Sequence, residues 1–192
     1  MFRNLFSAFK MKSTTSKILL GLLLGIVFML TANQLYRLRG KAEVSEEVKN
    51  ELNRLGQKAL ETNDVPVAAI VTYFDTIIGK GYNTVRRNHN LGGHAEINAL
   101  SDAYSKFGDE FSNLDRSKLV LYSTFEPCEM CKGALVHYNI KNVLFEQNKP
   151  MGVQLKSQLK QWRYELTKKR LSAPGLQESL FLKHPDYHGM ND

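Results

Sequence analysis

Two short stretches of the sequence combine residue types that bind metals and move protons. The first is HAE, beginning at His94, and the second is EPCEMC, whose cysteines are Cys128 and Cys131. Cysteines three residues apart lie on one face of a helix, and the positive end of the helix dipole favours their thiolates. Two thiolates and one imidazole are a suitable ligand set for zinc. The sequence therefore predicts a zinc site made of His94, Cys128 and Cys131.

Glu96 lies two residues after this histidine and is predicted to transfer protons rather than to bind the metal. Three protein ligands leave the fourth position of a tetrahedral zinc for water, whose pKa the metal lowers toward neutrality. A carboxylate at a helix start could take that water's proton and return it to a leaving group. Each part is a weak signal alone, because C-x-x-C also occurs in redox dithiols and in structural zinc sites.

Alternating strand and helix patterns are expected to position these residues. The pattern predicts helices over residues 45–62 and 94–106, one opened by Pro127, and an amphipathic one through residues 155–166. Strands are predicted over residues 65–74, 76–82, 118–124 and 141–146. Strands that alternate with helices indicate a mixed sheet covered on both faces.

The body of the chain resembles the cytidine/deoxycytidylate deaminase superfamily, and within it the branch of tRNA adenosine, guanine and yeast-type cytosine deaminases. The likeness covers roughly residues 44–146 and is carried by DVPVAAIVTY, GYN, HAEINAL, TFEPCEMCKGAL and NVLFE. H-x-E followed by P-C-x-x-C is the signature of zinc-dependent base deaminases. The resemblance implies an α/β protein with the three-layer α-β-α cytidine-deaminase-like fold and a mixed central sheet, here preceded by an N-terminal apolar helix.

The resemblance also implies roles for individual residues. It implies that His94, Cys128 and Cys131 bind Zn²⁺ and that Glu96 transfers protons. Asn83 matches an asparagine with which such enzymes contact the base, and the carbonyl of Glu126 is expected to assist the reacting amidine. His89, in the loop before the HAE block, is a further candidate substrate contact.

The charge of the chain is concentrated at its N-terminus. The net charge is +7, yet the first 41 residues hold seven of the 26 basic residues and none of the 19 acidic ones. The remaining residues carry equal numbers of each sign, so no large nucleic-acid surface is expected. This balance favours a small-molecule substrate.

The N-terminal segment contains an uncharged, mostly apolar run, Ile18–Ala32, after a basic lead. As a helix this run spans about 22 Å, short of the ~30 Å hydrocarbon core. We expect an uncleaved membrane anchor with the catalytic domain periplasmic or otherwise extracytoplasmic. A cleaved signal of a secreted protein and an organelle-targeting sequence are the alternatives. Residues 1–42 are accordingly separated from a deaminase domain over residues 43–192, of which residues 150–192 form a divergent C-terminal helix and tail.

The sequence thus predicts a zinc-dependent hydrolase that removes the amino group of a nucleobase, nucleoside or related heterocycle and releases ammonia. A tRNA or other RNA adenosine deaminase is the alternative of the same class. From other classes, a non-catalytic structural zinc module and a C-x-x-C thiol oxidoreductase remain open. Relatives of this type are often dimers, so a homodimer is compatible with the resemblance.

Overall fold

The structure is a computed structural model that describes residues 14–37, 43–169, 176–181 and 183. The chain forms two compact units, Met1–Glu46 and Glu47–Asp192. The predicted domain boundary after residue 42 stays a prediction. Residues 1–13 of the basic lead and residues 184–192 of the tail lie outside the described residues.

Among the described residues before residue 46, the N-terminal unit contains one helix, α1 (Thr14–Arg37). Within the described part of the chain, no helix combines the length and the apolar character that crossing a membrane requires. This finding contradicts the predicted membrane anchor and the extracytoplasmic placement that depended on it. The physical reason is length, because the apolar run covers only 15 of the 24 residues of α1 and polar residues flank it.

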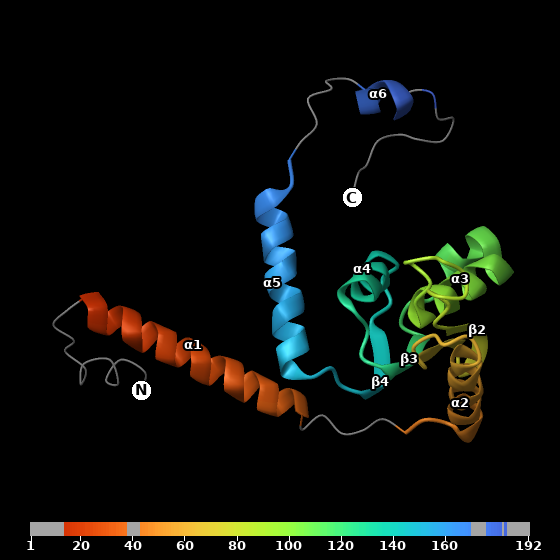
Figure 1. Ribbon diagram of the computed structural model, residues 1–192, viewed down its shortest axis with the longest axis horizontal. Coiled ribbons are helices and arrows are strands. Elements are labelled where there is room, and N and C mark those ends of the chain that lie inside the picture. The colour runs from red at the N-terminus through yellow and green to blue at the C-terminus, as the bar shows by residue number, and fades with distance from the viewer. Residues whose placement is uncertain (1–13, 38–42, 170–175, 182, 184–192) are drawn as a thin grey trace. The chain divides into compact units, whose positions relative to one another are not determined.

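The second unit is built on a four-stranded sheet with the order β2-β1-β3-β4 (Figure 1). Its strands are β1 (Ala68–Tyr73), β2 (Thr76–Tyr82), β3 (Leu119–Phe125) and β4 (Asn142–Gln147). Strand β1 is antiparallel to both β2 and β3, and β3 is parallel to β4. The predicted mixed sheet is therefore confirmed, and strands β2 and β3 run in the same direction.

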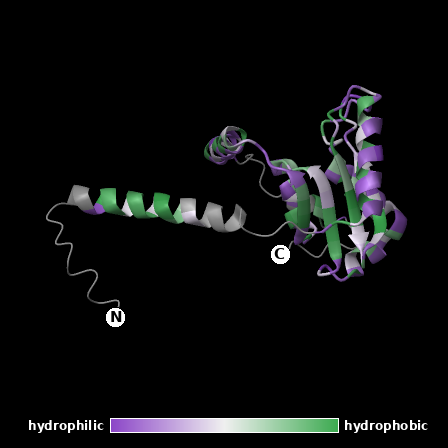
Figure 2. Ribbon diagram, turned by 90° about the horizontal axis from the view of Figure 1, so that it is seen from below, coloured by the Kyte–Doolittle hydropathy of each residue, from purple (hydrophilic) through white to green (hydrophobic). Residues whose placement is uncertain are grey.

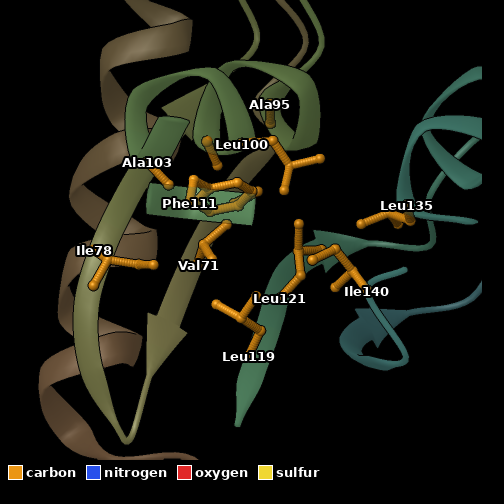
Figure 3. Packing of buried hydrophobic residues seen from close by; sticks show 12 residues of the cluster. Val71, Ile78, Ala95, Leu100, Ala103, Phe111, Leu119, Leu121, Leu135 and Ile140 are labelled. Carbon is orange, nitrogen blue, oxygen red and sulfur yellow. The ribbon is translucent and has the colours of Figure 1, made fainter. Parts of the chain in front are cut away.

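One face of the sheet packs against α3 (Ala95–Phe107) and α4 (Glu129–His137). Figure 3 shows Val71 and Leu121 of the sheet beside Leu100 and Phe111. All four side chains belong to the buried apolar core, which Leu135 of α4 extends. The core thus holds the two helices that carry the predicted metal ligands against a single sheet face.

The opposite face is covered as well. Ala68 and Ile70 are fully buried, although the pleat directs them away from the neighbouring residues Ala69 and Val71. Helix α2 (Glu46–Leu60) buries an apolar stripe formed by Val48, Leu55 and Ala59. Figure 1 shows α2 and α3 on opposite sides of the strands, and Figure 2 shows hydrophobic residues on the strands as well as along α1.

Helix α3 approaches β2 closely because two glycines of that strand lack a side chain. A Cβ atom added to Gly81 would lie 2.2 Å from the Ala95 carbonyl oxygen and 2.4 Å from the Ala99 nitrogen. One added to Gly79 would lie 2.3 Å from the Ala99 carbonyl oxygen. Since these neighbours are backbone atoms of α3, the glycines set the position of the helix on the sheet.

Most elements begin or end one or two residues from their predicted bounds, and two elements and one additional helix need a physical account. The strand expected from residue 65 begins at Ala68, because Val67 closes a tight turn onto the Val65 carbonyl and Pro66 has no N–H. The helix expected at Pro127 begins at Glu129, with Cys128 as its N-cap. The 3₁₀-helix Gly108–Asn113 was not predicted.

The C-terminal helices are α5 (Met151–Thr167) and α6 (Leu176–Phe181). The amphipathic helix predicted through residues 155–166 is present, but none of the residues of α5 is buried. Leu159 and Trp162 on its apolar stripe are 60% and 72% exposed. The first turn of α5 is nevertheless fastened to the body of the domain, as described below.

We predict that Gly81→Ala destabilises the domain by about 1–3 kcal/mol, because the new methyl group collides with the backbone of α3. Gly56→Ala is the matched control. Gly56 lies inside α2, where the nearest atom to an added Cβ is the Pro66 carbonyl oxygen at 3.8 Å. This control should gain about 0.5–1 kcal/mol. Urea unfolding followed by circular dichroism measures both, and equal stability of the two variants would contradict the packing argument.

A second prediction concerns Glu51 of α2, which accepts hydrogen bonds from Arg54 at 2.6 and 2.7 Å and pairs with Lys80 of β2 at 3.0 Å. The Arg54 hydrogen bonds, aided by Lys80, lower the pKa of Glu51 from 4.5 to about 2. The stabilisation is therefore complete above pH 4.5 and lost as the pH falls toward 2. Glu51→Gln should cost about 1 kcal/mol at pH 7.

Urea unfolding of both proteins across this acidic range measures the effect. The difference in stability should shrink below pH 4.5, where wild-type Glu51 begins to lose its advantage. Glu61→Gln, at an exposed position just after α2, is the control and should change stability by less than about 0.5 kcal/mol. A pH-independent difference for Glu51→Gln would refute the assignment.

Candidate active site

Two helix N-termini place the candidate catalytic residues at one edge of the sheet. His94 is the N-cap of α3, and Glu96 lies in its first turn. Cys128 is the N-cap of α4, and Cys131 lies in its first turn. Helix α3 follows β2 and α4 follows β3. Because β2 and β3 run in the same direction, their C-terminal ends, and the helices that follow, meet at the same edge.

The three predicted ligands converge. The His94 Nδ1 atom lies 3.4 Å from the Cys128 Sγ atom and 3.6 Å from the Cys131 Sγ atom. The two sulfur atoms are 3.4 Å apart. Zn–S and Zn–N bonds of about 2.3 and 2.1 Å in a tetrahedron require separations of about 3.6–3.8 Å between such atoms. The donor set and its spacing therefore fit zinc, and among the described residues these three form the group suited to a metal.

The two thiols are unequal before metal binds. The hydrogen bond between the cysteine side chains lowers the pKa of Cys128 to about 5. The same contact, together with burial, raises the pKa of Cys131 well above its ordinary value. At neutral pH the pair thus holds one proton and one thiolate, and the remaining proton must leave when zinc binds.

Glu96 stands beside this group without belonging to it. Its side chain is 4% exposed, and the Cys131 thiol donates to its Oε2 atom at 3.4 Å. Burial raises the pKa of the Glu96 carboxyl group, which brings it closer to neutrality. A carboxyl group with a raised pKa next to a metal site can exchange protons at the pH where an enzyme works.

A cavity of about 350 Å³ opens onto these residues. His94, Glu96 and Cys128 line the cavity together with residues from other segments. Val65 and Val67 precede β1, and Asn83 and Arg86 follow β2. Phe125 is the last residue of β3, and Lys149 precedes α5. This volume lies within the range of small-ligand pockets, so the site can admit a planar heterocycle.

Asn83 lies at the end of β2 and lines the cavity, as the resemblance implied. The residue is buried, its N–H donates to the Val67 carbonyl oxygen at 3.0 Å, and its Oδ1 atom accepts from the Val85 N–H at 3.1 Å. Among the described residues its Nδ2 group has no hydrogen-bond partner. Its predicted contact with the substrate base stays a prediction that this position supports.

Glu126 also lines the cavity, and its side chain has a structural use that was not predicted. The carboxylate accepts from Lys132 Nζ at 3.1 Å, from the Lys149 N–H at 3.0 Å and from Gln154 Nε2 at 2.9 Å. Burial opposes ionisation, but these donors outweigh it and lower the pKa of Glu126. The residue therefore ties the first turn of α5 to the loop that carries the cysteines. Its predicted carbonyl contact with the substrate stays a prediction.

Two predicted site residues, Cys131 and His89, do not lie among those lining the cavity. Cys131 is buried and contacts His94 and Cys128, whereas none of the described contacts joins His89 to this group. His89 is an exposed loop residue with a φ of 49°. Its role in substrate binding stays a prediction.

The sequence reading did not identify Asp64, Arg86 and Lys149, which do line the cavity. Asp64 begins the DVPVAAIVTY block, but nothing local in the sequence indicates the contacts of Asp64, Arg86 or Lys149, because their partners lie 22 residues away.

The chain matches a known protein family over the region that contains the candidate metal site. Residues 42–147 match the family described as the cytidine and deoxycytidylate deaminase zinc-binding region. The match covers more than half of the chain and contains all three metal ligands and Glu96. The protein belongs to this family, whose description agrees with the zinc-binding geometry seen here.

Two curated relatives share part of their sequence with the chain. The tRNA-specific adenosine deaminase of Buchnera aphidicola subsp. Baizongia pistaciae is 43% identical over 82 residues, which are 43% of this chain and 48% of that protein. The tRNA-specific adenosine deaminase 2 of Xenopus laevis is 34% identical over 113 residues, which are 54% of this chain and 62% of that protein. The chain thus spans about half to three fifths of the length of these relatives.

Solved structures support the fold. The guanine deaminase of Bacillus subtilis aligns with a TM-score of 0.55 at 20% identity, covering 75% of this chain and 99% of that one. A structure from work on A-to-I editing by tRNA:A34 deaminases aligns with a TM-score of 0.52 at 23% identity, covering 66% of this chain and 88% of that one. At these identities the likeness confirms the cytidine-deaminase-like architecture alone.

We predict about one zinc ion per chain in the purified protein and a loss of more than about half of it in His94→Ala and Cys131→Ser, because each removes one of three protein ligands. Elemental analysis by mass spectrometry measures the metal. His137→Ala is the control, since His137 is exposed at the end of α4, and it should retain zinc. Wild-type zinc content in Cys131→Ser would refute the ligand assignment.

Proposed function

We propose that the protein is a zinc-dependent hydrolytic deaminase that acts on a nucleobase, a nucleoside or a related aminated heterocycle. The observation that carries the proposal is the buried Glu96 carboxyl group beside a three-ligand metal site in the wall of a cavity. A general acid–base group, an open metal position and a pocket for a planar ring are the requirements of base deamination.

The chemistry divides between the metal and the chain. Zinc, when bound, supplies the Lewis acidity that makes a water molecule nucleophilic near neutral pH. Glu96 accepts a proton from the attacking water and delivers it to a ring nitrogen of the substrate. Glu96 then returns the second proton of the water to the departing amino group. Water and the aminated ring are consumed, and ammonia and the ring carbonyl are formed.

The surrounding residues orient the substrate. The Asn83 amide offers its Nδ2 donor to the cavity, where a ring nitrogen or a carbonyl oxygen of the base can accept it. The backbone carbonyl of Glu126 can accept a hydrogen bond from the amino group that leaves. Phe125 and Val67 supply apolar walls against which a planar base can stack.

Two alternatives from other classes explain less of the site. A structural zinc module needs a fourth protein ligand, and among the described residues no fourth histidine or cysteine joins the group. A thiol oxidoreductase would use the two free cysteines but gives no role to His94 or to the buried Glu96. The deaminase assigns a task to all four residues.

A tRNA adenosine deaminase is the second candidate of the same class. The observation that favours it is the 34–43% identity to tRNA-specific adenosine deaminases through the metal-binding region. The equal numbers of acidic and basic residues after residue 41 favour a small substrate instead. A predicted homodimer is compatible with both candidates and stays a prediction.

Ammonia release from the zinc-loaded full chain tests the proposal and separates the candidates. The panel contains bases, nucleosides, nucleotides and aminopyrimidines, and a parallel reaction with tRNA is analysed for inosine. Turnover of a small heterocycle would support the first candidate, and inosine in tRNA alone would support the second. Metal-loaded protein that releases no ammonia from any of these substrates would contradict the proposed function.

We predict that Glu96→Gln keeps about one zinc per chain but lowers kcat at least about 100-fold, since the amide cannot carry the proton. Steady-state ammonia release together with elemental analysis measures both quantities. Glu129→Gln is the matched control, because Glu129 lies in the first turn of α4 but does not line the cavity. It should keep kcat within about twofold of the wild type. Comparable kcat for the two variants would exclude Glu96 as the proton carrier.

A further inference from the structure

Asp64 is a buried carboxylate that the metal site does not use. It lies in the turn between α2 and β1 and is 4% exposed. The preceding residue, Asn63, has a φ of 56°, and the Asp64 N–H donates to the Ala59 carbonyl oxygen at 3.0 Å. The turn therefore holds this side chain in the wall of the cavity, which it lines.

Both carboxylate oxygens of Asp64 bind groups of the chain. The Oδ1 atom accepts from the Arg86 backbone N–H at 2.7 Å. The Oδ2 atom accepts from the Arg87 backbone N–H at 3.2 Å and from the Thr62 hydroxyl at 2.8 Å. Hydrogen bonds in which the acceptor is ionised are shorter and stronger than neutral ones. Asp64 therefore anchors two consecutive N–H groups of a loop that begins 19 residues later in the chain.

The anchored loop connects β2 to α3 and spans residues 83–93; we call it the β2–α3 loop. The Arg86 N–H bound by Asp64 adjoins Val85, whose N–H donates to the Asn83 side chain at 3.1 Å. The Asp64 carboxylate, the turn and the Asn83 amide thus form a chain of adjacent contacts. Because Val85 fixes the Oδ1 end of the amide, the Nδ2 end is directed by the same turn.

The base of the β2–α3 loop, on both sides of Asn83, has a second anchor. The Asn98 side chain on α3 donates to the Tyr82 carbonyl oxygen at 2.8 Å and to the Thr84 hydroxyl at 3.0 Å. The Thr84 N–H donates to the Gly93 carbonyl oxygen at 2.8 Å. These contacts close the base of the loop on α3, whereas the turn around Arg86 is held to the domain through Asp64.

We propose that Asp64 is a positioning residue for substrate binding, which sets the Asn83 amide in the cavity by holding the turn of the β2–α3 loop. This inference rests on the proposed function, because it assigns the Asn83 amide to the substrate. Asp64 itself touches neither the metal ligands nor Glu96. Its loss should therefore weaken substrate binding while the proton transfer and the metal remain.

Asp64→Asn tests the proposal, since it preserves the size of the side chain but removes its charge and presents an N–H₂ group to backbone N–H donors. We expect KM to rise about tenfold while kcat and zinc content stay within about threefold of the wild type. A merely structural role would lower the fraction of folded enzyme, which reduces the apparent kcat and leaves KM unchanged. The KM-against-kcat split thus separates positioning from stability.

Asp102→Asn is the matched control. Asp102 of α3 also accepts a backbone N–H from a residue 22 positions away, that of Lys80, at 2.8 Å. It does not line the cavity, so KM should be unchanged in this variant. Asp64→Glu is the second variant and keeps the charge. It should recover part of the lost affinity for substrate if the charged acceptor matters, and it remains informative if Asp64→Asn folds poorly.

Amide hydrogen exchange of the same proteins provides a readout that needs no activity. Peptides covering residues 83–93 should exchange faster in Asp64→Asn than in the wild type and in Asp102→Asn, while those of β1 should not change. Unchanged exchange in the loop overturns the inference, and so does faster exchange with unchanged KM and kcat. If the wild type releases no ammonia from any substrate, the proposed function fails and the exchange experiment alone decides whether Asp64 holds the loop.

Discussion

The site depends on one topological constraint: the strand β1 lies between two strands that both run antiparallel to it. Strands β2 and β3 therefore point the same way and end at one edge of the sheet, two strand spacings or about 10 Å apart. The helices that follow them begin there, with His94 capping one and Cys128 capping the other. Residues more than 30 positions apart in the chain are brought within 3.6 Å by this arrangement.

That constraint also explains why the helices must sit close to the sheet. An imidazole and a thiol can share a metal only if both helix starts lie within one side-chain length of each other. The glycines of β2 allow the backbone of α3 to approach the strand directly. The alanines Ala95, Ala99 and Ala103 on the facing side of α3 are all fully buried. The small residues on both sides of this contact therefore help to position the metal ligands as well as to pack the core.

Burying a carboxyl group and two thiols without a metal is costly. The chain reduces this cost through hydrogen bonds, because the two sulfur atoms lie 3.4 Å apart and the Cys131 thiol donates to the Glu96 carboxyl group. The Glu96 pKa is raised by the same burial. Bound zinc would lower this cost further, because its positive charge compensates the negative charges of the two thiolates and the carboxylate. Metal binding is therefore expected to stabilise the fold as well as to complete the site.

The parts of the structure that could be predicted are those that depend on residues close together in the sequence. The bounds of β2 follow from the turn that begins at Asp75 and were predicted residue for residue, and the ligand set follows from HAE and C-x-x-C. The start of α4 was placed too early, because Pro127 suits a first helical turn but Cys128, with an extended backbone, occupies the N-cap position after it. The prediction of a membrane anchor was wrong, because the apolar run of 15 residues has the composition of an anchor but not the length.

What local sequence could not reveal are contacts between a side chain and a distant backbone. Asp64 binds two N–H groups, and Glu126 binds the start of α5, yet any polar residue in a loop looks the same in a sequence. These contacts hold the loops that line the cavity, whereas His94, Glu96 and Cys128 reach it from helix starts held by the sheet. Loops vary more than the scaffold that carries the catalytic residues. The motif therefore predicts the type of reaction, but it does not predict the substrate. The β2–α3 loop and the segment around Lys149 line the cavity, and each is held by a carboxylate, Asp64 or Glu126, whose contacts are made with residues distant in the sequence.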